Sequence, residues 1–355
     1  MKKAGIIALG ILAGSAQAQT AVNIYGIVDA AIVGESGGVA KTTKLTSGAG
    51  AFSRLGFKGS EDLGDGLSAY FILESGIRID SGAVDTTGSI FNRQALVGLK
   101  GKAGSVSLGR QYTPWHATLA AIADPFANGY AGSTKNLFPD WGSNVRTSNT
   151  IMVASPIVNG FSGDLAYSAG EQSTLSAGRQ YGGSIGYAGG PLVVRLAYNA
   201  RNADVVPATG TPTLHDLGRN TLLAANYAFK AFKLYAAYGI DKGYNSAPLG
   251  NTSNPYGGVP ATPSTDSNEA LLGLTAPIGS GTLMFSVMHK NDKTAFNQDA
   301  NAWGIGYLYM LSRRTGLYAA YAHIDNKNGA GYTVANNSES GTGSTGYNLG
   351  IRHSF

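Results

Sequence analysis

Basic residues occur at four positions whose spacing could bring them onto one charged surface. In SRLGFKG, Arg54 and Lys58 share one parity of an extended segment, while apolar side chains hold the other parity. Arg93 follows in FNRQAL and Arg146 in NVRTSNT. A guanidinium group stays charged and presents several donors to a carboxylate or phosphate. Together the four residues indicate a site that attracts anions.

Acidic residues near these positions give each arginine a second interpretation. Arg93 could pair with Glu74 on a neighbouring strand, and Arg78 has the same parity as Glu74. The stretch RQALVGLK does not alternate cleanly, so the direction of the Arg93 side chain stays open. Each arginine is therefore either a brace within a wall, together with Glu74 and Arg78, or part of a charged filter.

Carboxylates are scarce in the long stretch 112–148. The only two are Asp124 and Asp140, set against Lys135 and Arg146. We expect Asp124 to supply the negative side of a transverse field. Because so few acids oppose the basic residues, we predict that an opening lined by these residues would pass anions in preference to cations.

Side chains for catalysis or metal binding form no recognisable pattern. The chain has no cysteine, which excludes disulfides, thiolate metal sites and cysteine nucleophiles. The five histidines (116, 215, 289, 323 and 353) show no paired ligand spacing, and SEDLGDG lacks the spacing of a calcium loop. We expect no enzyme activity, no metal and no cofactor. The alternative is an enzyme built on a β-barrel, with its polar cluster at the barrel rim.

The first eighteen residues have the pattern of an export signal. Lys2 and Lys3 precede the apolar run AGIIALGILAG, and an A-Q-A site follows at 16–18. The run is shorter than the roughly 20 residues of a spanning helix. We predict a signal peptide at 1–18 and a mature chain from Gln19. Removal of the two lysines lowers the formal net charge from +5 to +3.

Composition favours a membrane β-barrel. The 355 residues include 51 Gly and 19 Tyr and only 13% charged residues, yet no apolar run after the export signal has the length of a membrane helix. In a barrel, apolar lipid-facing positions alternate with polar lumen-facing positions, so their hydropathies cancel when averaged over a window of residues. A secreted β-sandwich, such as an adhesin, or a β-solenoid is the alternative.

The two-residue period of strands recurs along the chain. It is clear in GPLVVRLAYNAR, RNTLLAANYAF, AFKLYAAYGID and ANAWGIGYLYML. Seven short turns and eight long loops would join sixteen strands, and sixteen strands enclose a water-filled lumen. The predicted turns are 60–66, 102–105, 159–160, 188–191, 229–232, 278–281 and 312–315, and the predicted loops are 34–51, 80–90, 112–148, 170–178, 202–218, 242–266, 291–300 and 325–343. We therefore expect residues 19–355 to form a single all-β domain, a 16-stranded antiparallel transmembrane β-barrel.

Several longer motifs resemble a known family. SRLGFKGSEDLGDGLSAYFILESG, FNRQALVGLKGKAGSVSLGRQYTPW, GYLYMLSRRTGLYAAYAHID and the terminal GIRHSF resemble the trimeric general porins of Gram-negative bacteria, especially the β-proteobacterial type. The resemblance covers the whole mature chain. It implies three sixteen-stranded barrels per assembly in the outer membrane, each with its third long loop folded inward.

The stretch 112–148 is the loop expected to narrow such a barrel. It carries too much apolar surface for a floppy tail, and its segment ATLAAIADPFANG resembles the constriction segment of the family. By the same resemblance, Arg54, Arg93 and Arg146 match the basic cluster that faces this loop. An outer lid or a surface antigenic loop is the alternative.

The expected function is passive diffusion of small hydrophilic solutes and ions with an anion preference. A substrate-selective channel is the nearest alternative. The resemblance implies a homotrimer that contacts outer-membrane lipid and lipopolysaccharide and is assembled by the barrel-assembly machinery. No nucleic acid is expected as a partner.

The last strand, STGYNLGIRHSF, ends on an aromatic residue. Tyr347, Leu349, Ile351 and Phe355 share one parity, which we expect to face lipid. The strand must pair with AVNIYGIVDA near the start of the mature chain, because a barrel has no free edge. By family resemblance, Phe355 is also the signal read by the assembly machinery.

Overall fold

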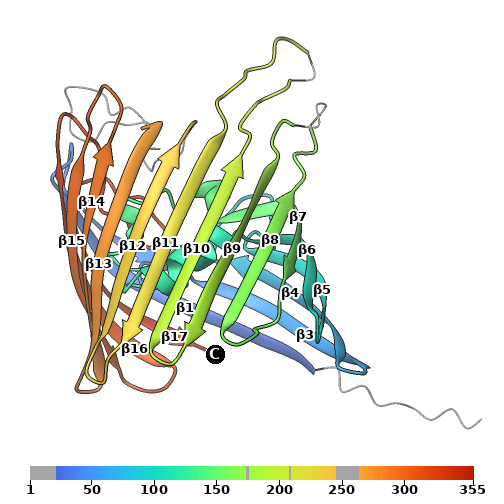
Figure 1. The fold of residues 1–355 in the computed structure, drawn as a ribbon. Helices are drawn as coiled ribbons and strands as arrows, with labels where there is room; N and C mark the ends of the chain where they lie inside the picture. Colours follow the sequence, from blue (N-terminus) through green and yellow to red (C-terminus); the bar gives the residue numbers. More distant parts are fainter. Residues whose placement is uncertain (1–20, 173–175, 208, 245–263) are drawn as a thin grey trace, which may run out of the picture.

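One antiparallel sheet that closes on itself contains most of the chain (Figure 1). The computed structural model describes residues 21–172, 176–207, 209–244 and 264–355. The predicted signal peptide (1–18) and most of the predicted loop 242–266 lie outside the described residues. Within the described ranges, no helix is long and apolar enough to cross a membrane.

The sheet is built from seventeen strand segments, each antiparallel to its neighbours. In chain order they are β1 (Ala21–Ser36), β2 (Thr42–Ser47), β3 (Arg54–Gly64), β4 (Leu67–Gly76), β5 (Gln94–Gly101), β6 (Gly104–Tyr112), β7 (Arg146–Ala154), β8 (Phe161–Ser168), β9 (Gln180–Gly189), β10 (Leu192–Arg201), β11 (Gly218–Ala228), β12 (Lys233–Lys242), β13 (Asp266–Ile278), β14 (Gly281–Asp292), β15 (Ala300–Met310), β16 (Thr315–Asn326) and β17 (Thr345–Ser354).

Two of these segments, β2 and β3, share one position in the barrel. Both pair with β1, β2 along residues 30–35 and β3 along residues 21–27. The barrel therefore has sixteen strand positions, as predicted. The predicted loop 34–51 is wrong in extent, because β1 continues to Ser36 and the chain re-enters the sheet at Thr42.

Residues 48–53 leave the wall between β2 and β3, but the backbone groups of β1 beside this interruption remain hydrogen-bonded. The Asp29 carbonyl accepts a hydrogen bond from the Gly48 N–H (2.8 Å), and the Asp29 N–H donates to the Ser53 hydroxyl (3.0 Å). The Asp29 carboxylate in turn accepts from the Tyr318 hydroxyl (2.6 Å). The interruption thus keeps the pairing that a buried backbone requires.

The barrel closes between its first and last strands. β17 pairs with β1 along residues 345–354, which confirms the predicted partner of the terminal strand. Gly26 and Phe355 exchange both backbone hydrogen bonds, at 3.2 and 3.1 Å. The Phe355 side chain covers Gly26, where a Cβ atom would come within 2.4 Å of the aromatic ring.

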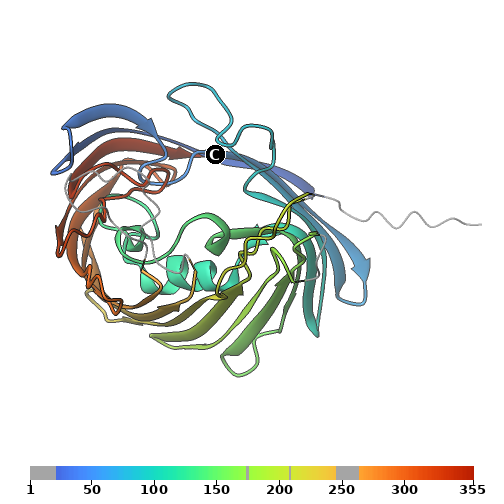
Figure 2. The same cartoon turned by 90° about the horizontal axis from the view of Figure 1, so that it is seen from above.

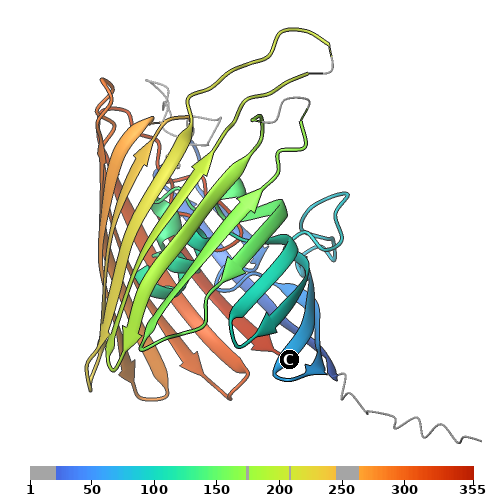
Figure 3. The same ribbon diagram turned by 45° about the vertical axis from the view of Figure 1, so that its right-hand side comes forward.

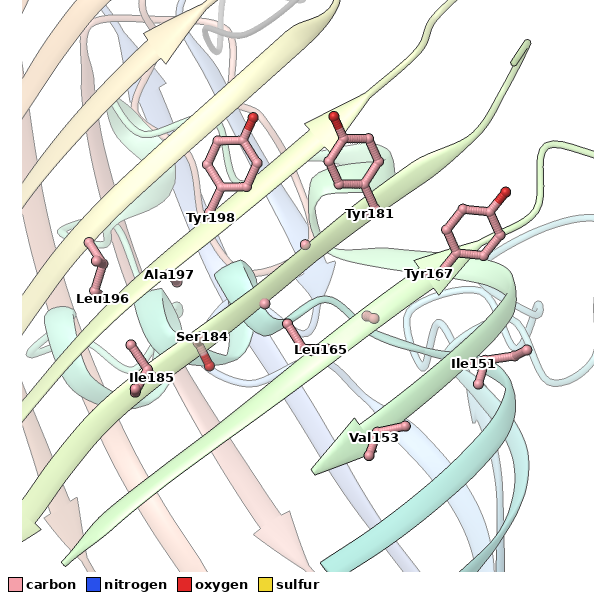
Figure 4. Close-up of a pocket in the computed structure, with 13 residues that line it drawn as sticks. Ile151, Val153, Leu165, Tyr167, Tyr181, Ser184, Ile185, Leu196, Ala197 and Tyr198 are labelled. Atoms are coloured by element: carbon pink, nitrogen blue, oxygen red, sulfur yellow. The ribbon is translucent and has the colours of Figure 1, made fainter. Parts of the chain in front are cut away.

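Side chains alternate between the two faces of the barrel as predicted. On β17, Leu349 is 57% exposed and its neighbour Asn348 only 3%; on β11, Leu223 is 49% exposed and Leu222 is fully buried. A shallow, largely apolar groove of about 630 Å³ follows the outer face of β7–β10 (Figure 4). An apolar outer face over a fully paired backbone suits a hydrocarbon surrounding.

The two ends and the two sides of the barrel differ. Short turns gather at the lower end and long loops at the upper end in Figure 1. β5 to β8 have only eight or nine residues, whereas β13 has 13 and β14 has 12. In Figure 3 the wall around β3–β6 reaches less high than the wall around β13–β15, and we call it the low wall.

The buried apolar core lies inside the barrel, around the loop 113–145, which we call loop 3. This loop holds the short helices α1 (Pro114–Thr118), η1 (Leu119–Ala123), η2 (Thr134–Asn136) and η3 (Gly142–Asn144). Five of its large apolar side chains are 1% exposed or less: Trp115, Leu119, Phe126, Leu137 and Phe138. Figure 2 shows α1 and η1 running inside the circle of strands. The prediction of an inward loop is therefore confirmed.

Two glycines meet where loop 3 contacts the wall at β15. A Cβ atom on Gly304 of β15 would lie 2.4 Å from the Cα atom of Gly132. The Ser286 hydroxyl donates a hydrogen bond to the Gly132 carbonyl (2.8 Å). Only glycine at position 304 allows this contact between loop and wall.

Replacing Gly304 tests whether this contact holds the loop. Gly304→Val should push loop 3 off the wall at a cost of about 1–3 kcal/mol. We expect a lower unfolding temperature of the barrel and a larger single-channel conductance. Ala319→Val on the outer face of β16 is the control. Equal conductance and stability for the two variants would show that the contact is not limiting.

Candidate functional site: a constriction lined by arginines

Loop 3 enters the lumen through a helix that begins directly at the wall. The Thr113 hydroxyl caps α1 by accepting a hydrogen bond from the His116 N–H (3.1 Å), and Pro114 stands in the first turn, where its missing N–H costs nothing. The helical segment places three small side chains along the lumen: Ala117, Ala120 and Ala121. These three positions therefore carry no charge, and Lys135, the charged residue of loop 3 that lines the cavity, is paired with Asp140 at 3.6 Å.

The carboxylate of Asp124 organises the turn that follows η1. It accepts hydrogen bonds from the backbone N–H groups of Phe126 (2.9 Å), Asn128 (3.0 Å) and Thr134 (3.0 Å), and from the Thr134 hydroxyl (2.9 Å). The Asp124 side chain is 3% exposed. Its negative charge is directed into the loop rather than into the lumen.

A second buried acid, Asp140, fixes the returning half of loop 3. His116 lies 2.6 Å from one carboxylate oxygen, while Asn128 (2.5 Å) and Lys135 (3.6 Å) contact the other. Burial alone would raise the pKa of Asp140, but His116 and Lys135 hold this pKa well below its usual range. Asp140 therefore stays ionised at neutral pH and keeps the loop folded.

The tip of loop 3 is attached to the far wall. The Tyr130 N–H donates to the Ala49 carbonyl (2.8 Å), and the Tyr130 hydroxyl accepts from the Arg352 guanidinium (3.0 Å). Tyr130 also packs edge-on against Tyr318 at 4.9 Å between ring centroids. The segment 48–53 leaves the wall to make this attachment.

The last long loop, residues 327–344 (loop 8), also folds inward. Its Tyr332 is 2% exposed, although no pattern in the sequence indicates this burial. The Asn337 side chain accepts from the Phe52 N–H (3.1 Å) and donates to the Asn128 carbonyl of loop 3. Loop 8 thus joins loop 3 to the segment 48–53.

A cavity of about 810 Å³ lies between the helical side of loop 3 and the low wall. Within the described part of the chain, its only acidic lining residue is Asp85. Its basic lining residues are Arg54, Arg78, Arg93, Arg110, Lys135 and Arg146. The cavity is therefore strongly asymmetric, with alanines on one side and guanidinium groups on the other.

Glu74 stands between two of these arginines. Its carboxylate lies 2.7 Å from Arg93 and 3.5 Å from Arg54, and it accepts a hydrogen bond from the Tyr25 hydroxyl (3.0 Å). The pairing of Arg93 with Glu74 matches the brace interpretation, yet both arginines also line the cavity. One buried carboxylate cannot neutralise two guanidinium groups, so the trio keeps a net positive charge.

Arg146 is held in a different way, by Tyr112 at the end of β6. Its guanidinium lies 4.5 Å from the centre of the Tyr112 ring and donates to the Tyr112 hydroxyl (3.0 Å). Arg93 donates to the same hydroxyl (2.7 Å). The structure thus brings Arg54, Arg93 and Arg146 close together around Glu74 and Tyr112.

Comparison with known proteins accounts for this geometry. The model of the Gram-negative porin family matches residues 5–329. The chain belongs to this family. It is an outer-membrane β-barrel and a passive channel rather than an enzyme.

Similar porins span the whole chain. Outer membrane porin protein 32 of Delftia acidovorans is 33% identical over 379 residues, and an outer membrane porin protein of Bordetella pertussis is 30% identical over 401 residues, with complete coverage of both chains in each case. An anion-selective porin from Comamonas acidovorans superposes with a TM-score of 0.78 at 28% identity, covering 95% of this chain and all of that one. A trimer form of OmpT from Vibrio cholerae, at 15% identity and a TM-score of 0.68, shares the fold.

Two other predicted residues lie at the margin of the constriction. Lys58 shares the lumen side of β3 with Arg54 but lies over the Tyr25 ring (5.0 Å to its centre), beyond the residues that line the cavity. Arg78 lines the cavity and is paired with Asp85 at 3.1 Å. Their contribution to the field is therefore smaller than that of Arg146.

The expected role of Asp124 does not match its position in this porin. We expected it to form the negative side of a transverse field, but four hydrogen bonds inside loop 3 engage its buried carboxylate. Burial raises the pKa of Asp124 to about 6, even though these donors act in the opposite direction. Asp124 shapes the loop and does not line the cavity.

Removing Asp124 tests this distinction. Asp124→Ala leaves three backbone N–H groups without an acceptor, at a cost of about 1–3 kcal/mol each. We expect noisier single-channel currents and more frequent closures, with an unchanged ratio of anion to cation permeability. Asp80→Ala, in the exposed loop 77–93, is the control. A clear rise in anion preference would instead place the Asp124 charge in the filter.

Proposed function

We propose that this porin conducts small hydrophilic solutes and ions by passive diffusion and prefers anions. The supporting observation is the charge of the cavity, which in the described chain is lined by five arginines, by Lys135 paired with Asp140, and by a single carboxylate, Asp85. Asp85 is already paired with Arg78. No acid of loop 3 lines the opposite side, so the field at the narrowest section is positive.

The magnitude of this field is sufficient for selectivity. A unit charge about 5 Å from an ion changes its energy by roughly 3 kcal/mol at an effective dielectric constant of 20. Mobile ions screen the interaction over about 8 Å at physiological ionic strength. The basic residues therefore act on an ion inside the cavity and hardly on one outside it. The anion selectivity stated for the similar porin from Comamonas acidovorans supports the same conclusion.

Two substitutions of opposite sign test the proposal. Arg146→Gln removes a guanidinium that pairs with no carboxylate among the residues that the structure describes, and it should lower the anion-to-cation permeability ratio roughly two- to fivefold. Glu74→Gln removes the acid between Arg54 and Arg93 and should raise the ratio. Reversal potentials across a potassium chloride gradient in a planar bilayer measure both changes.

Arg313→Gln, in a short turn remote from the cavity, is the matched control for loss of one positive charge. The same ratio for Arg313→Gln and Arg146→Gln would contradict the assignment of the filter. A preference for cations in the unmodified porin would reject the proposed function itself.

We also propose that the porin assembles as a homotrimer through its low wall. The loop 77–93 extends outward from the barrel in both Figure 2 and Figure 3. It carries exposed apolar side chains, including Ile90 at 69% exposure, and Val22 and Ile24 of β1 are also largely exposed. Apolar side chains on a projecting loop suit contact with a second barrel better than contact with water.

Outer-membrane lipid, including lipopolysaccharide, is the proposed surrounding of the remaining outer face. Three tyrosines of β8–β10, Tyr167, Tyr181 and Tyr198, stand at one end of the outer groove (Figure 4). Aromatic residues with a polar tip prefer the level of lipid headgroups. This arrangement supports a headgroup boundary near the outer rim.

Phe355 is proposed as the signal for the barrel-assembly machinery. Its side chain is 43% exposed next to the seam, where a partner protein can reach it. Deletion of Phe355 should reduce the amount of trimer in the outer membrane, seen as a band that changes mobility on boiling. The barrels that do form should conduct normally, because Phe355 does not line the cavity.

Phe161→Ala, which removes another exposed aromatic side chain from the outer face, is the control for loss of apolar surface. Equal membrane yields of the Phe355 deletion and of Phe161→Ala would contradict a role as signal. A changed conductance would instead assign Phe355 to the pore structure.

A further inference from the structure

Two arginines of the filter lie on aromatic rings. The Arg93 guanidinium lies 4.5 Å from the centre of the Phe52 ring, and the Arg146 guanidinium lies 4.5 Å from that of Tyr112. A ring attracts a cation through its quadrupole but adds no opposite charge. Arg195 shows the contrast to Arg146, because its contact with Asp164 at 2.6 Å neutralises it, whereas no carboxylate of the described residues pairs with Arg146. Aromatic contacts fix an arginine and leave its charge in place.

Tyr112 holds both arginines at once. Its hydroxyl accepts hydrogen bonds from Nη2 of Arg93 (2.7 Å) and from Nη2 of Arg146 (3.0 Å). Its ring also stacks on His116 of α1, at 4.9 Å between centroids and 16° between planes. The phenol is thus fixed both by the helix of loop 3 and by Arg146.

A neutral acceptor shared by Arg93 and Arg146 allows these two like charges to lie close together. Two guanidinium groups that contact the same oxygen atom repel each other. Without a shared acceptor they would move apart or pair with carboxylates. Glu74 already pairs with Arg93 and Arg54 and is 3% exposed. A phenol oxygen has two lone pairs and no net charge, so it can satisfy a donor of each arginine without cancelling either.

We propose that Tyr112 is the positioning residue that keeps Arg146, which pairs with no carboxylate of the described residues, beside Arg93, whose carboxylate partner Glu74 is shared with Arg54, and that it thereby sets the strength of the anion preference. The inference rests on the proposed function, since it concerns the same cavity. It assigns a determinant of selectivity to a residue that carries no charge.

Tyr112→Phe tests the inference without changing any charge. The ring and its stacking on His116 remain, and only the shared acceptor is lost. We expect the anion-to-cation permeability ratio, measured from reversal potentials of single channels, to fall roughly two- to threefold. Tyr70→Phe is the matched control, because Tyr70 lies on β4, two strands away from β6 in the sheet, with its ring over Gly98 of β5.

A double variant separates positioning from a general structural effect. If Tyr112 acts through Arg146 and Arg93, then Tyr112→Phe in an Arg146→Gln background should change the ratio much less than in the unmodified porin, because the effects of coupled residues are not additive. Tyr112→His, which keeps a ring and a nitrogen acceptor, should restore part of the preference. Equal effects in the two backgrounds would overturn the inference.

The outcomes distinguish the inference from the function on which it rests. A cation preference in the unmodified porin overturns the proposed function, and the inference with it. An anion preference that is the same in the unmodified porin, Tyr112→Phe and Tyr70→Phe overturns only the inference. A fall confined to Tyr112→Phe and suppressed in the Arg146→Gln background supports both.

Discussion

Backbone hydrogen bonding that continues around the whole barrel is the constraint on which the rest of the structure depends. Hydrocarbon offers no partner for a peptide group, so the sheet must close, and it does so where β17 meets β1. Even where the chain leaves the wall at residues 48–53, Gly48 and Ser53 satisfy the backbone of Asp29. Because the backbone of the wall is hydrogen-bonded within the sheet, the loops inside the barrel can shape the pore.

The interior shows how a charged filter can be fixed without losing its charge. Loop 3 is held by two buried acids, Asp124 and Asp140, whose negative charges are directed into the loop. On the opposite wall, Arg54 and Arg93 share one carboxylate, Arg78 pairs with Asp85, and aromatic rings hold Arg93 and Arg146. The result is a positive field between a row of alanines and a row of guanidinium groups, which would produce the proposed anion preference without a dedicated binding site.

Much of this arrangement follows from local sequence rules. Alternating parity predicts the strands and their lipid face, because that period is imposed by the pleat and by the two solvents on either side. It also places Arg54 on the lumen side. The order of turns and loops predicts sixteen strand positions. The family resemblance predicts that Arg93 and Arg146 face the constriction loop.

The remaining features depend on contacts between distant segments. Arg110 was missed because the register of β6 shifts between Gly109 and Gln111, which breaks the alternation used to assign its face. The inward fold of loop 8 depends on the bonds of Asn337 to Phe52 and Asn128, far apart in sequence. Asp124 looked like a pore acid because sequence cannot show that four donors surround it.

Anion preference that weakens with salt is the most direct consequence of a filter made of fixed positive charge. The decisive measurement is the anion-to-cation permeability ratio of the unmodified porin across concentration gradients at increasing mean ionic strength. The account predicts a ratio above one that declines as the screening length shortens from about 10 Å at 0.1 M to about 3 Å at 1 M. A ratio below one at low salt, or one that does not change with salt, would contradict it.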